Sequence, residues 1–365
     1  MKIFHIINSL GNGGAEKNLI RLILNDNKNI HHVIALKKNN FHNKILRKNK
    51  IKIFQFDISL NKNFFNDLKK INRIIFKNKP TILMCWMYHS ILIGTLINLI
   101  QRKTKLIWNI RHSNFSLRNT KLTTIILARF IISFLHLIPK AIIYNSSHSL
   151  KVHNSFFIFN KKQLVIRNGF NLPSRIINKK QKMSDKITKI GFVGRYSPQK
   201  NHHFFFKFLS KLNKDKICFK TYLVGNNVNK NNRNLKELVN RYNLHKNVIF
   251  LKEKKNIDNY YQRFDLVIST SFYGESFPNI LAESMMNKTI CIAPNIGENL
   301  FIINDKKLIY KKNDLSDLYI KYTKILKYKD KKQWFLLQNK LHNRVKNELT
   351  IKKMLYSYNN LLSSI

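Results

Sequence analysis

Two glutamates lie eight positions apart in residues 274–283, which read Gly-Glu-Ser-Phe-Pro-Asn-Ile-Leu-Ala-Glu. The apolar, β-branched run 265–270 predicts a buried strand before them, and residues 281–286 predict a helix after them. A loop between a strand and a helix can bind phosphorylated ligands, because the helix N-terminus offers unpaired N–H groups and a positive dipole end. We therefore expect Glu275 in the loop and Glu283 on the second helical turn. The alternative is a solvated helix on which the two carboxylates share no role.

A Gly-rich loop, residues 8–16, connects the first predicted strand to the first predicted helix. Gly13 and Gly14 stand at the predicted helix start, where a backbone can approach a phosphate or a sugar closely. The loop lacks the G-x-G-x-x-G spacing and the lysine of a P-loop, so dinucleotide or ATP binding fits poorly. A plain tight turn is the alternative.

The third chemical motif is the short segment 194–201, which contains Gly194, Arg195 and Lys200 and follows the first predicted strand of the second half. Two cations beside one helix start suit a diphosphate, through charge pairing and bidentate hydrogen bonds. Solvated surface charge is the alternative, above all for Lys200 in a chain so rich in lysine.

Histidines close two neighbouring predicted strands of the first half. His112 follows the strand 106–110, and His89 follows the strand 82–86 just after Trp86. In an open parallel sheet, the carboxyl ends of the strands line the ligand crevice. His112 is therefore a candidate site residue.

The composition excludes some classes of protein and leaves others open. The chain has 365 residues, 44% of them hydrophobic, which is enough for two domains with full cores. Its net charge of +49 would suit nucleic acid or an anionic membrane. However, Lys outnumbers Arg roughly four to one, and the cations are spread along the chain rather than clustered. We interpret most of the charge as compositional background.

Cysteine usage and hydropathy point to a cytoplasmic protein. Cys85, Cys218 and Cys291 are far apart and odd in number, which predicts reduced core thiols without a disulfide framework or a zinc site. The N-terminus does not read as a signal peptide. The apolar run 122–138 is too short for a membrane span and contains Arg129 and His136. It predicts a core helix or an interfacial helix.

Strand-like and helix-like runs alternate twice along the chain, separated by a polar, basic stretch at residues 171–188. Such alternation predicts parallel sheets covered by helices on both faces. The expected fold class is therefore α/β, with two doubly wound Rossmann-like domains. The predicted strands are 3–7, 32–36, 51–56, 82–86, 106–110, 141–145, 164–167, 190–193, 219–224, 248–251, 266–270 and 290–293. The predicted helices are 15–24, 64–76, 89–100, 121–137, 147–157, 204–212, 234–242, 280–286, 314–328, 332–347 and 351–362.

Together these motifs resemble the retaining glycosyltransferases of family 4, which have the GT-B fold. The Trp86 and Trp108 segments are most similar to the subgroup that builds bacterial surface polysaccharides. The resemblance implies an N-terminal acceptor-side domain at 1–172, a linker at 173–187 and a nucleotide-sugar donor domain at 188–348. It also implies that residues 349–365 form a C-terminal helix that packs back on the first domain.

The resemblance also implies a role for each site residue. Glu283 would bind the ribose hydroxyls of the donor and Glu275 the donor sugar. Arg195 and Lys200, with Gly194 between strand and loop, would hold the diphosphate without a metal or other cofactor. The donor would also lie against four residues that lead into the helix: Phe277, Pro278, Asn279 and Ile280. His112 would face the sugar, and Gly13 and Gly14 would approach the diphosphate.

The implied reaction moves a sugar from a nucleotide-diphosphate sugar to a saccharide or lipid-linked acceptor, in polysaccharide or lipopolysaccharide synthesis. The enzyme would be cytoplasmic and could act on an anionic membrane surface, to which residues 117–140 would dock. We expect no nucleic acid partner. Two alternatives stay open at this point: a basic nucleic-acid-binding protein, and a sugar-nucleotide 2-epimerase of the same fold.

Overall fold

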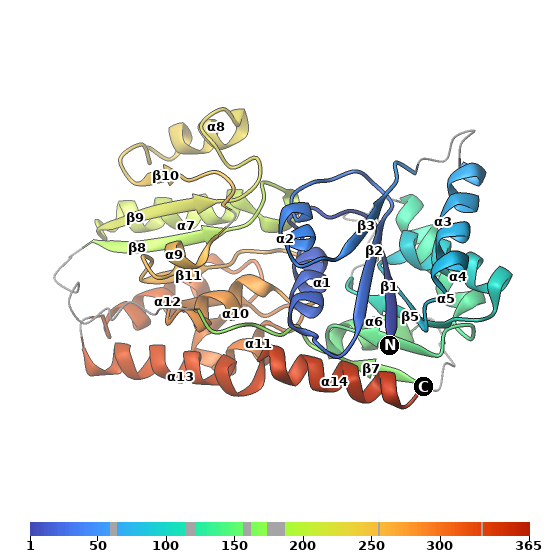
Figure 1. Ribbon diagram of the computed structural model, residues 1–365. Coiled ribbons are helices and arrows are strands. Elements are labelled where there is room, and N and C mark those ends of the chain that lie inside the picture. The colour runs from blue at the N-terminus through green and yellow to red at the C-terminus, as the bar shows by residue number, and fades with distance from the viewer. Residues whose placement is uncertain are drawn as a thin grey trace. The chain divides into compact units, whose positions relative to one another are not determined.

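The computed structural model describes residues 1–58, 64–113, 115, 122–155, 162–173, 187–254, 256–329 and 331–365. The chain divides into two compact units. Unit 1 comprises Met1–Gly169 and Ile351–Ile365, and unit 2 comprises Phe170–Thr350. Most of the predicted linker 173–187 lies outside the described residues. Each unit contains one parallel sheet with helices packed on it (Figure 1).

The sheet of unit 1 has seven parallel strands in the order β3-β2-β1-β4-β5-β6-β7. Their bounds are β1 Lys2–Ile7, β2 Ile30–Ala35, β3 Lys52–Gln55, β4 Ile82–Trp86, β5 Lys105–Ile110, β6 Ala141–Tyr144 and β7 Gln163–Val165. The helices are α1 Gly14–Asn25, α2 Asn43–Lys48, α3 Phe64–Asn78, α4 Tyr88–Gln101, α5 Leu122–Leu135, α6 Ser147–Asn154 and the C-terminal α14 Ile351–Ser363.

Alternate residues of these strands face two separate cores. Ile82, Met84 and Trp86 of β4 pack with α1 and α14, whereas Leu83 and Cys85 pack on the opposite face with α3, α4 and α5. Both faces of the sheet are therefore buried, which explains why the strands read as continuous apolar runs rather than alternating ones.

The sheet of unit 2 has six parallel strands in the order β10-β9-β8-β11-β12-β13. Their bounds are β8 Thr188–Val193, β9 Phe219–Val224, β10 Val248–Phe250, β11 Leu266–Ile268, β12 Ile290–Pro294 and β13 Ile309–Tyr310. The helices of the described residues are α7 His202–Lys214, α8 Arg233–Arg241, α9 Asp258–Tyr261, α10 Asn279–Met286, α11 Asn299–Ile303, α12 Leu315–Leu326 and α13 Lys332–Glu348, and their 3-10 turns are η2 Pro198–Lys200 and η3 Lys306–Leu308.

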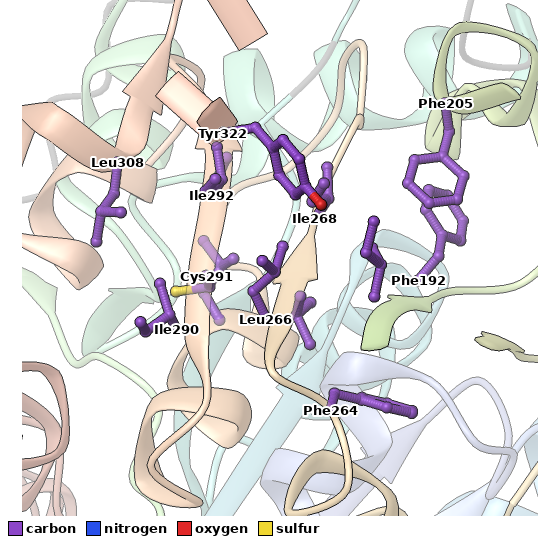
Figure 2. Close-up of a cluster of buried hydrophobic side chains, with 14 of the residues drawn as sticks. Phe192, Phe205, Phe264, Leu266, Ile268, Ile290, Cys291, Ile292, Leu308 and Tyr322 are labelled. Carbon is purple, nitrogen blue, oxygen red and sulfur yellow. The ribbon is translucent and has the colours of Figure 1, made fainter. Parts of the chain in front are cut away.

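The core of unit 2 is built from the strands of its sheet and from the helices that pack on it, among them α7, α10, α12 and α13. Figure 2 shows Leu266 and Ile268 of β11 beside Ile292 of β12, with Phe205 of α7 and Tyr322 of α12 in the same cluster. These side chains fix β11, whose carboxyl end leads into the loop that carries Glu275.

The two doubly wound sheets confirm the predicted fold class. In each sheet the strand order reverses direction at one point, between β1 and β4 in unit 1 and between β8 and β11 in unit 2. Ligands of doubly wound sheets bind outside the carboxyl ends of the strands at such a switch point. A ligand is therefore expected at the loops after β8 and β11 in unit 2, and after β1 and β4 in unit 1.

One prediction about the cysteines is wrong. Cys85 and Cys291 are buried as expected, but Cys218 is exposed. It immediately precedes β9 and therefore stands where the chain enters the sheet from the surface, not within the apolar run itself.

Candidate active site

The loop between β11 and α10 positions both glutamates in unit 2. Glu275 lies in the loop and Glu283 on the second turn of α10, and both side chains are buried, with 9% and 6% exposure. Burying a carboxylate is costly unless a cation or hydrogen-bond donors compensate it. The partners of these two groups therefore indicate what the site is built to hold.

Glu275 is paired with Lys200, whose ammonium contacts Oε1 of the carboxylate. The side chains are 15% and 9% exposed, so this ion pair is largely shielded from water. Ser271 Oγ donates a further hydrogen bond to Glu275 Oε1 at 2.8 Å. The carboxylate is thus held by one cation and one hydroxyl, on the side of the loop that follows β8.

Backbone contacts bring these two loops together. Thr270 Oγ1, just after β11, donates to the carbonyl oxygens of Lys200 at 2.9 Å and Asn201 at 3.2 Å. The Phe272 N–H donates to the carbonyl of Gln199 at 2.8 Å. The loop after β11 is thereby tied to the η2 turn after β8, and this connection places Lys200 against Glu275 across the switch point.

Three glycines permit this close packing. A Cβ on Gly194 would lie 3.1 Å from Cγ and Cδ of Lys200, and one on Gly225 would lie 2.1 Å from the Gly194 carbonyl oxygen. Gly297 has φ of +52°, and a Cβ there would lie 1.9 Å from the Glu275 carbonyl oxygen. Because only glycine adopts that φ easily and leaves that space, Gly297 sets how closely the loop after β12 approaches Glu275.

Glu283 has a different partner. The Tyr261 hydroxyl on α9 donates to its Oε2 at 3.1 Å. A carboxylate offers about four lone-pair sites, so it can accept several hydrogen bonds at once. This arrangement is compatible with a carboxylate that accepts further hydroxyl groups.

The other predicted site residues of this unit differ in their exposure and in their contacts. Arg195 is exposed and donates to Gln199 Oε1 at 3.1 Å, so the structure does not bring it to the Lys200–Glu275 pair. Phe277 is buried and stacks on Phe170 with ring centroids 6.4 Å apart. Pro278 is the N-cap of α10, and Asn279 and Ile280 form its first turn.

Gly13 and Gly14 of unit 1 lie at the N-terminus of α1, as predicted. Gly13 is the N-cap with φ of −88°, a conformation open to any residue. A Cβ there would lie 2.2 Å from Oε2 of Glu16. The absence of a side chain at Gly13 therefore makes room for the Glu16 carboxylate at the positive end of the helix dipole, where an anion is favoured.

His112 follows β5 and is held by its backbone and its ring. Its carbonyl accepts a hydrogen bond from Ser149 Oγ at 2.7 Å, and its ring packs edge-on against Tyr88 and Phe115 with centroids 6.1 and 6.0 Å apart. Burial lowers the pKa of His112, which favours the neutral imidazole at neutral pH.

His153 supports this aromatic group from α6. Its Nδ1 must donate to the Ser149 carbonyl at 2.7 Å, because a carbonyl can only accept. Its Nε2 therefore accepts from the Tyr88 hydroxyl, also at 2.7 Å. Burial lowers the pKa of His153 to about 4, so the ring keeps this neutral tautomer. Neither Ser149 nor His153 was a predicted site residue, because nothing local in the sequence distinguishes them.

Two properties of the described residues concern metals and membranes. No cluster of three or more His, Cys, Asp or Glu side chains among them could hold a metal ion. None of the described helices is both long enough and apolar enough to span a bilayer.

A family model matches part of the second half of the chain. Residues 174–347 match the family model described as glycosyl transferases group 1, so unit 2 carries a domain of that group. No curated protein sequence matches the chain.

Solved structures show the same fold over the full length. The HepE protein of Anabaena, solved in complex with UDP and glucose, superposes with a TM-score of 0.84 at 19% identity, covering 100% of both chains. A glycosyltransferase of Rickettsia africae gives a TM-score of 0.82 at 20% identity, covering 99% of this chain and 97% of that one. The lipopolysaccharide outer core galactosyltransferase WaaB gives 0.72 at 17% identity, covering 100% of both chains. These likenesses establish a GT-B-like architecture.

Proposed function

We propose that the protein is a retaining, metal-independent glycosyltransferase that transfers a sugar from a nucleotide-diphosphate sugar to a saccharide acceptor. The observation that carries this proposal is the buried Lys200–Glu275 pair at the switch point of unit 2, within a domain of the glycosyl transferases group 1. The complex of HepE with UDP and glucose supports a nucleotide-sugar donor.

In the proposed reaction, each group has its own task. When the bond between sugar and diphosphate breaks, negative charge grows on the leaving phosphate, and preplaced cations lower the barrier. Lys200 is such a cation, and Arg195, which shortly precedes the η2 turn, would supply a second one. Glu275 would hydrogen-bond the donor sugar, and Glu283 would accept the ribose hydroxyls.

His112 would face the sugar as a neutral hydrogen-bonding group. Its lowered pKa prevents it from adding a third positive charge near the diphosphate. It can therefore orient a sugar hydroxyl without competing for the leaving group. Retention would follow from departure and attack on the same face of the sugar, which needs no separate protein nucleophile.

A donor panel tests this proposal. Thermal unfolding with different nucleoside diphosphates should show one base that stabilises the protein, by about 2.7 kcal/mol at a ligand concentration of 100 Kd. The matching nucleotide sugar should then release its nucleoside diphosphate in the presence of a saccharide acceptor, with EDTA present. The glycosidic product should keep the anomeric configuration of the donor.

Other outcomes would identify the alternatives. A 2-epimerase would invert C2 of the sugar and consume no acceptor, which NMR of the products distinguishes. A nucleic-acid-binding protein would bind plain DNA with a log–log salt slope of several units. If no nucleotide stabilises the protein and no sugar is transferred, the proposed function is wrong.

We further propose that the acceptor is lipid-linked and that the protein works at the cytoplasmic membrane surface. The support comes from α5, where Ile125, Ala128, Ile131 and Ile132 face the core. The opposite face of the same segment exposes five large apolar side chains at a spacing of three or four residues: Leu122, Ile126, Phe130, Phe134 and Leu137. The predicted core helix and the predicted interfacial helix are therefore compatible, since each uses one face.

Charge makes an anionic bilayer the fitting occupant of this face. Arg129 and Lys140 are exposed beside the apolar stripe, and cations at a membrane surface add about 1 kcal/mol each. Arg118 and Lys121, two further cations of the predicted docking segment 117–140, lie outside the described residues. The likeness to WaaB, a lipopolysaccharide outer core galactosyltransferase, supports an acceptor of this class.

Vesicle co-sedimentation tests the membrane proposal. Binding to anionic vesicles should fall with salt. It should also fall in the double variant Phe130→Ser/Phe134→Ser. The matched control is Phe65→Ser/Phe76→Ser, which alters two exposed phenylalanines of α3 in the same unit. If both double variants bind as the parent does, or the parent fails to bind at low salt, α5 does not dock on lipid.

A further inference from the structure

A buried guanidinium in unit 1 has only neutral partners. Arg111 is 9% exposed, and no carboxylate of the described residues lies within ion-pair distance of it. Buried charges are normally paired, because leaving water costs several kcal/mol per ion. A cation kept in such a place by dipoles alone requires many well-placed acceptors.

Four side chains supply those acceptors. Arg111 Nε donates to Asn109 Oδ1 at 2.7 Å, NH1 to Asn168 Oδ1 at 2.5 Å and NH2 to the Tyr358 hydroxyl at 2.5 Å. Asn18, with its amide oxygen turned to the guanidinium, accepts from NH1 and NH2 at 3.2 Å each. All five N–H groups of the guanidinium thus have an acceptor. We refer to these five residues as the Arg111 cluster.

The partners within the cluster also bind one another. Asn109 Nδ2 donates to the Tyr358 hydroxyl at 2.8 Å. In the same amide orientation, Asn18 donates to Asn168 Oδ1 at 3.2 Å. Removing one member therefore takes hydrogen bonds from at least two others, so we expect the cluster to respond as a unit.

One face of the guanidinium is covered by Trp86, whose ring centroid is 4.9 Å from Arg111 Cζ. The indole is fixed by a chain of buried groups with one possible direction. Trp86 Nε1 can only donate, and it donates to His5 Nδ1 at 3.2 Å. His5 Nε2 then donates to His31 Nδ1 at 2.9 Å, and His31 Nε2 to Asp26 Oδ2 at 3.2 Å.

The partners of Arg111 come from segments that lie far apart in the sequence. Asn168 stands one residue before the chain leaves unit 1 at Gly169, and Tyr358 stands on α14, the helix with which the chain returns at Ile351. Asn18 lies on α1, behind the Gly13–Gly14 turn. Arg111 itself immediately precedes His112. One guanidinium therefore binds both segments through which the chain crosses between the units, and the strand end that carries His112.

We propose that Arg111 is a positioning residue for sugar transfer, which holds His112 in register with the two crossing segments through the five hydrogen bonds of its planar fork. This inference rests on the proposed function, because its effect is exerted through His112. The fork geometry is the essential property: an ammonium offers three donors around one point and cannot reach four separate acceptors. Charge alone would not replace it.

Turnover and nucleotide binding provide the first test. Arg111→Lys keeps the charge and loses the fork, and we expect kcat to fall at least tenfold per folded molecule. The Kd for the nucleoside diphosphate should stay within twofold, because Lys200, Glu275 and Glu283 all lie in unit 2. Arg344→Lys is the matched control, since Arg344 also covers an aromatic ring, Phe301 at 4.9 Å, and donates to a carbonyl, but far along the chain on α13. It should leave kcat within twofold.

Hydrogen exchange provides a readout that does not depend on activity. In Arg111→Lys, exchange should accelerate at the amides of α14 and at those around Asn168 together, and it should not change in β8 and β9. Tyr358→Phe, which removes one hydroxyl and keeps the ring, should reproduce this pattern in weaker form. Trp86 fluorescence should shift in both variants.

The outcomes separate the two proposals. If Arg111→Lys keeps kcat within twofold, Arg111 is not a positioning residue, whatever the exchange data show. If α14 and the Asn168 segment respond independently, the cluster does not act as a unit and the inference is overturned. If the parent transfers no sugar from any donor while the coupled exchange is present, the proposed function fails but the cluster itself is supported.

Discussion

Each unit contains a cation that is largely shielded from water near the carboxyl ends of its strands, and the two cations are compensated in opposite ways. In unit 2, Lys200 is paired directly with the carboxylate of Glu275, and only one other side chain, Ser271, donates to that carboxylate oxygen among the described residues. In unit 1, Arg111 has four neutral acceptors and an aromatic face. Lys200 therefore has few hydrogen-bond partners, whereas every N–H group of Arg111 has an acceptor.

The difference indicates which cation can take part in chemistry. An ammonium has three donors, and a single carboxylate contact leaves it able to share its charge with an incoming anion. The Arg111 guanidinium has no donor left for a ligand, so it can only hold its neighbours in place. We therefore expect substitutions in unit 2 to change ligand affinity and chemistry directly, and those in unit 1 to act through position or stability.

The largest expected difference between the units is their loss of stability in acid, because lowered histidine pKa values are commoner in unit 1. Six described histidines there have pKa values below the ordinary range, chiefly through burial: His5, His32, His42, His89, His112 and His153. Three do so in unit 2: His202, His203 and His342. A lowered histidine pKa means that the unfolded chain takes up protons first, so stability falls as the pH drops below about 6.5.

The expected size follows from the fully buried rings. For His153, with a pKa of about 4, the loss between pH 7 and pH 5 is about 2 kcal/mol, and His5, whose pKa is also lowered by burial, adds to this loss. Asp26, whose pKa the hydrogen bonds from His31 and Asn29 lower to about 2 against its burial, adds a loss only below about pH 4. Urea unfolding is measured at both pH values, and a pulse of hydrogen exchange at one fixed pH reports which unit has unfolded. Unit 1 should lose more stability than unit 2. Equal losses would contradict the assignment.

The next largest effect is expected from substitution of Lys200. Lys200→Gln, whose amide can still donate to Glu275, should lower kcat by about 10²–10³ because it removes charge stabilisation of the leaving diphosphate. Arg195→Ala should have a smaller effect, since Arg195 is exposed and its charge is screened by water. Lys211→Ala is the control, because Lys211 is an exposed lysine of unit 2 paired with Asp215 at 3.0 Å. Equal effects of Lys200→Gln and Lys211→Ala would remove Lys200 from the mechanism.

The sequence predicted most of the fold, because its signals are local. Buried strands such as β4 appear as short apolar runs, and the predicted bounds 82–86 coincide with Ile82–Trp86. Three short helices were not predicted: α2, α9 and α11. Each has six residues or fewer, and so short a segment does not repeat the helical period often enough to be recognised.

The site was predictable only where motif residues carry it. Gly194, Lys200, Glu275 and Glu283 belong to recognisable motifs, and the structure joins Lys200 to Glu275 across 75 positions of sequence. Their supports were missed. Tyr261 is 22 positions from Glu283, and Tyr358 is 247 positions from Arg111, so only the folded chain brings them together. Polar partners of this kind leave no periodic pattern in a sequence.

The smallest expected effect is on nucleotide affinity and concerns Glu283 and its partner Tyr261. Glu283→Gln removes a charge-assisted acceptor of the ribose hydroxyls, which should weaken nucleotide binding by about 1.5–3 kcal/mol. Tyr261→Phe removes only the hydroxyl that orients the carboxylate, 3.1 Å from its Oε2, and should cost about 0.5–1.5 kcal/mol, or roughly two- to twelvefold in Kd. Calorimetric titration with the nucleoside diphosphate measures both.

In unit 1, Arg111→Lys should leave the same Kd unchanged, because its effect is on the position of His112 rather than on the nucleotide. If Tyr261→Phe weakens binding as much as Glu283→Gln, the phenol itself contacts the ligand. If neither variant changes the Kd, Glu283 does not bind the ribose, and the nucleotide must be held by other groups of unit 2.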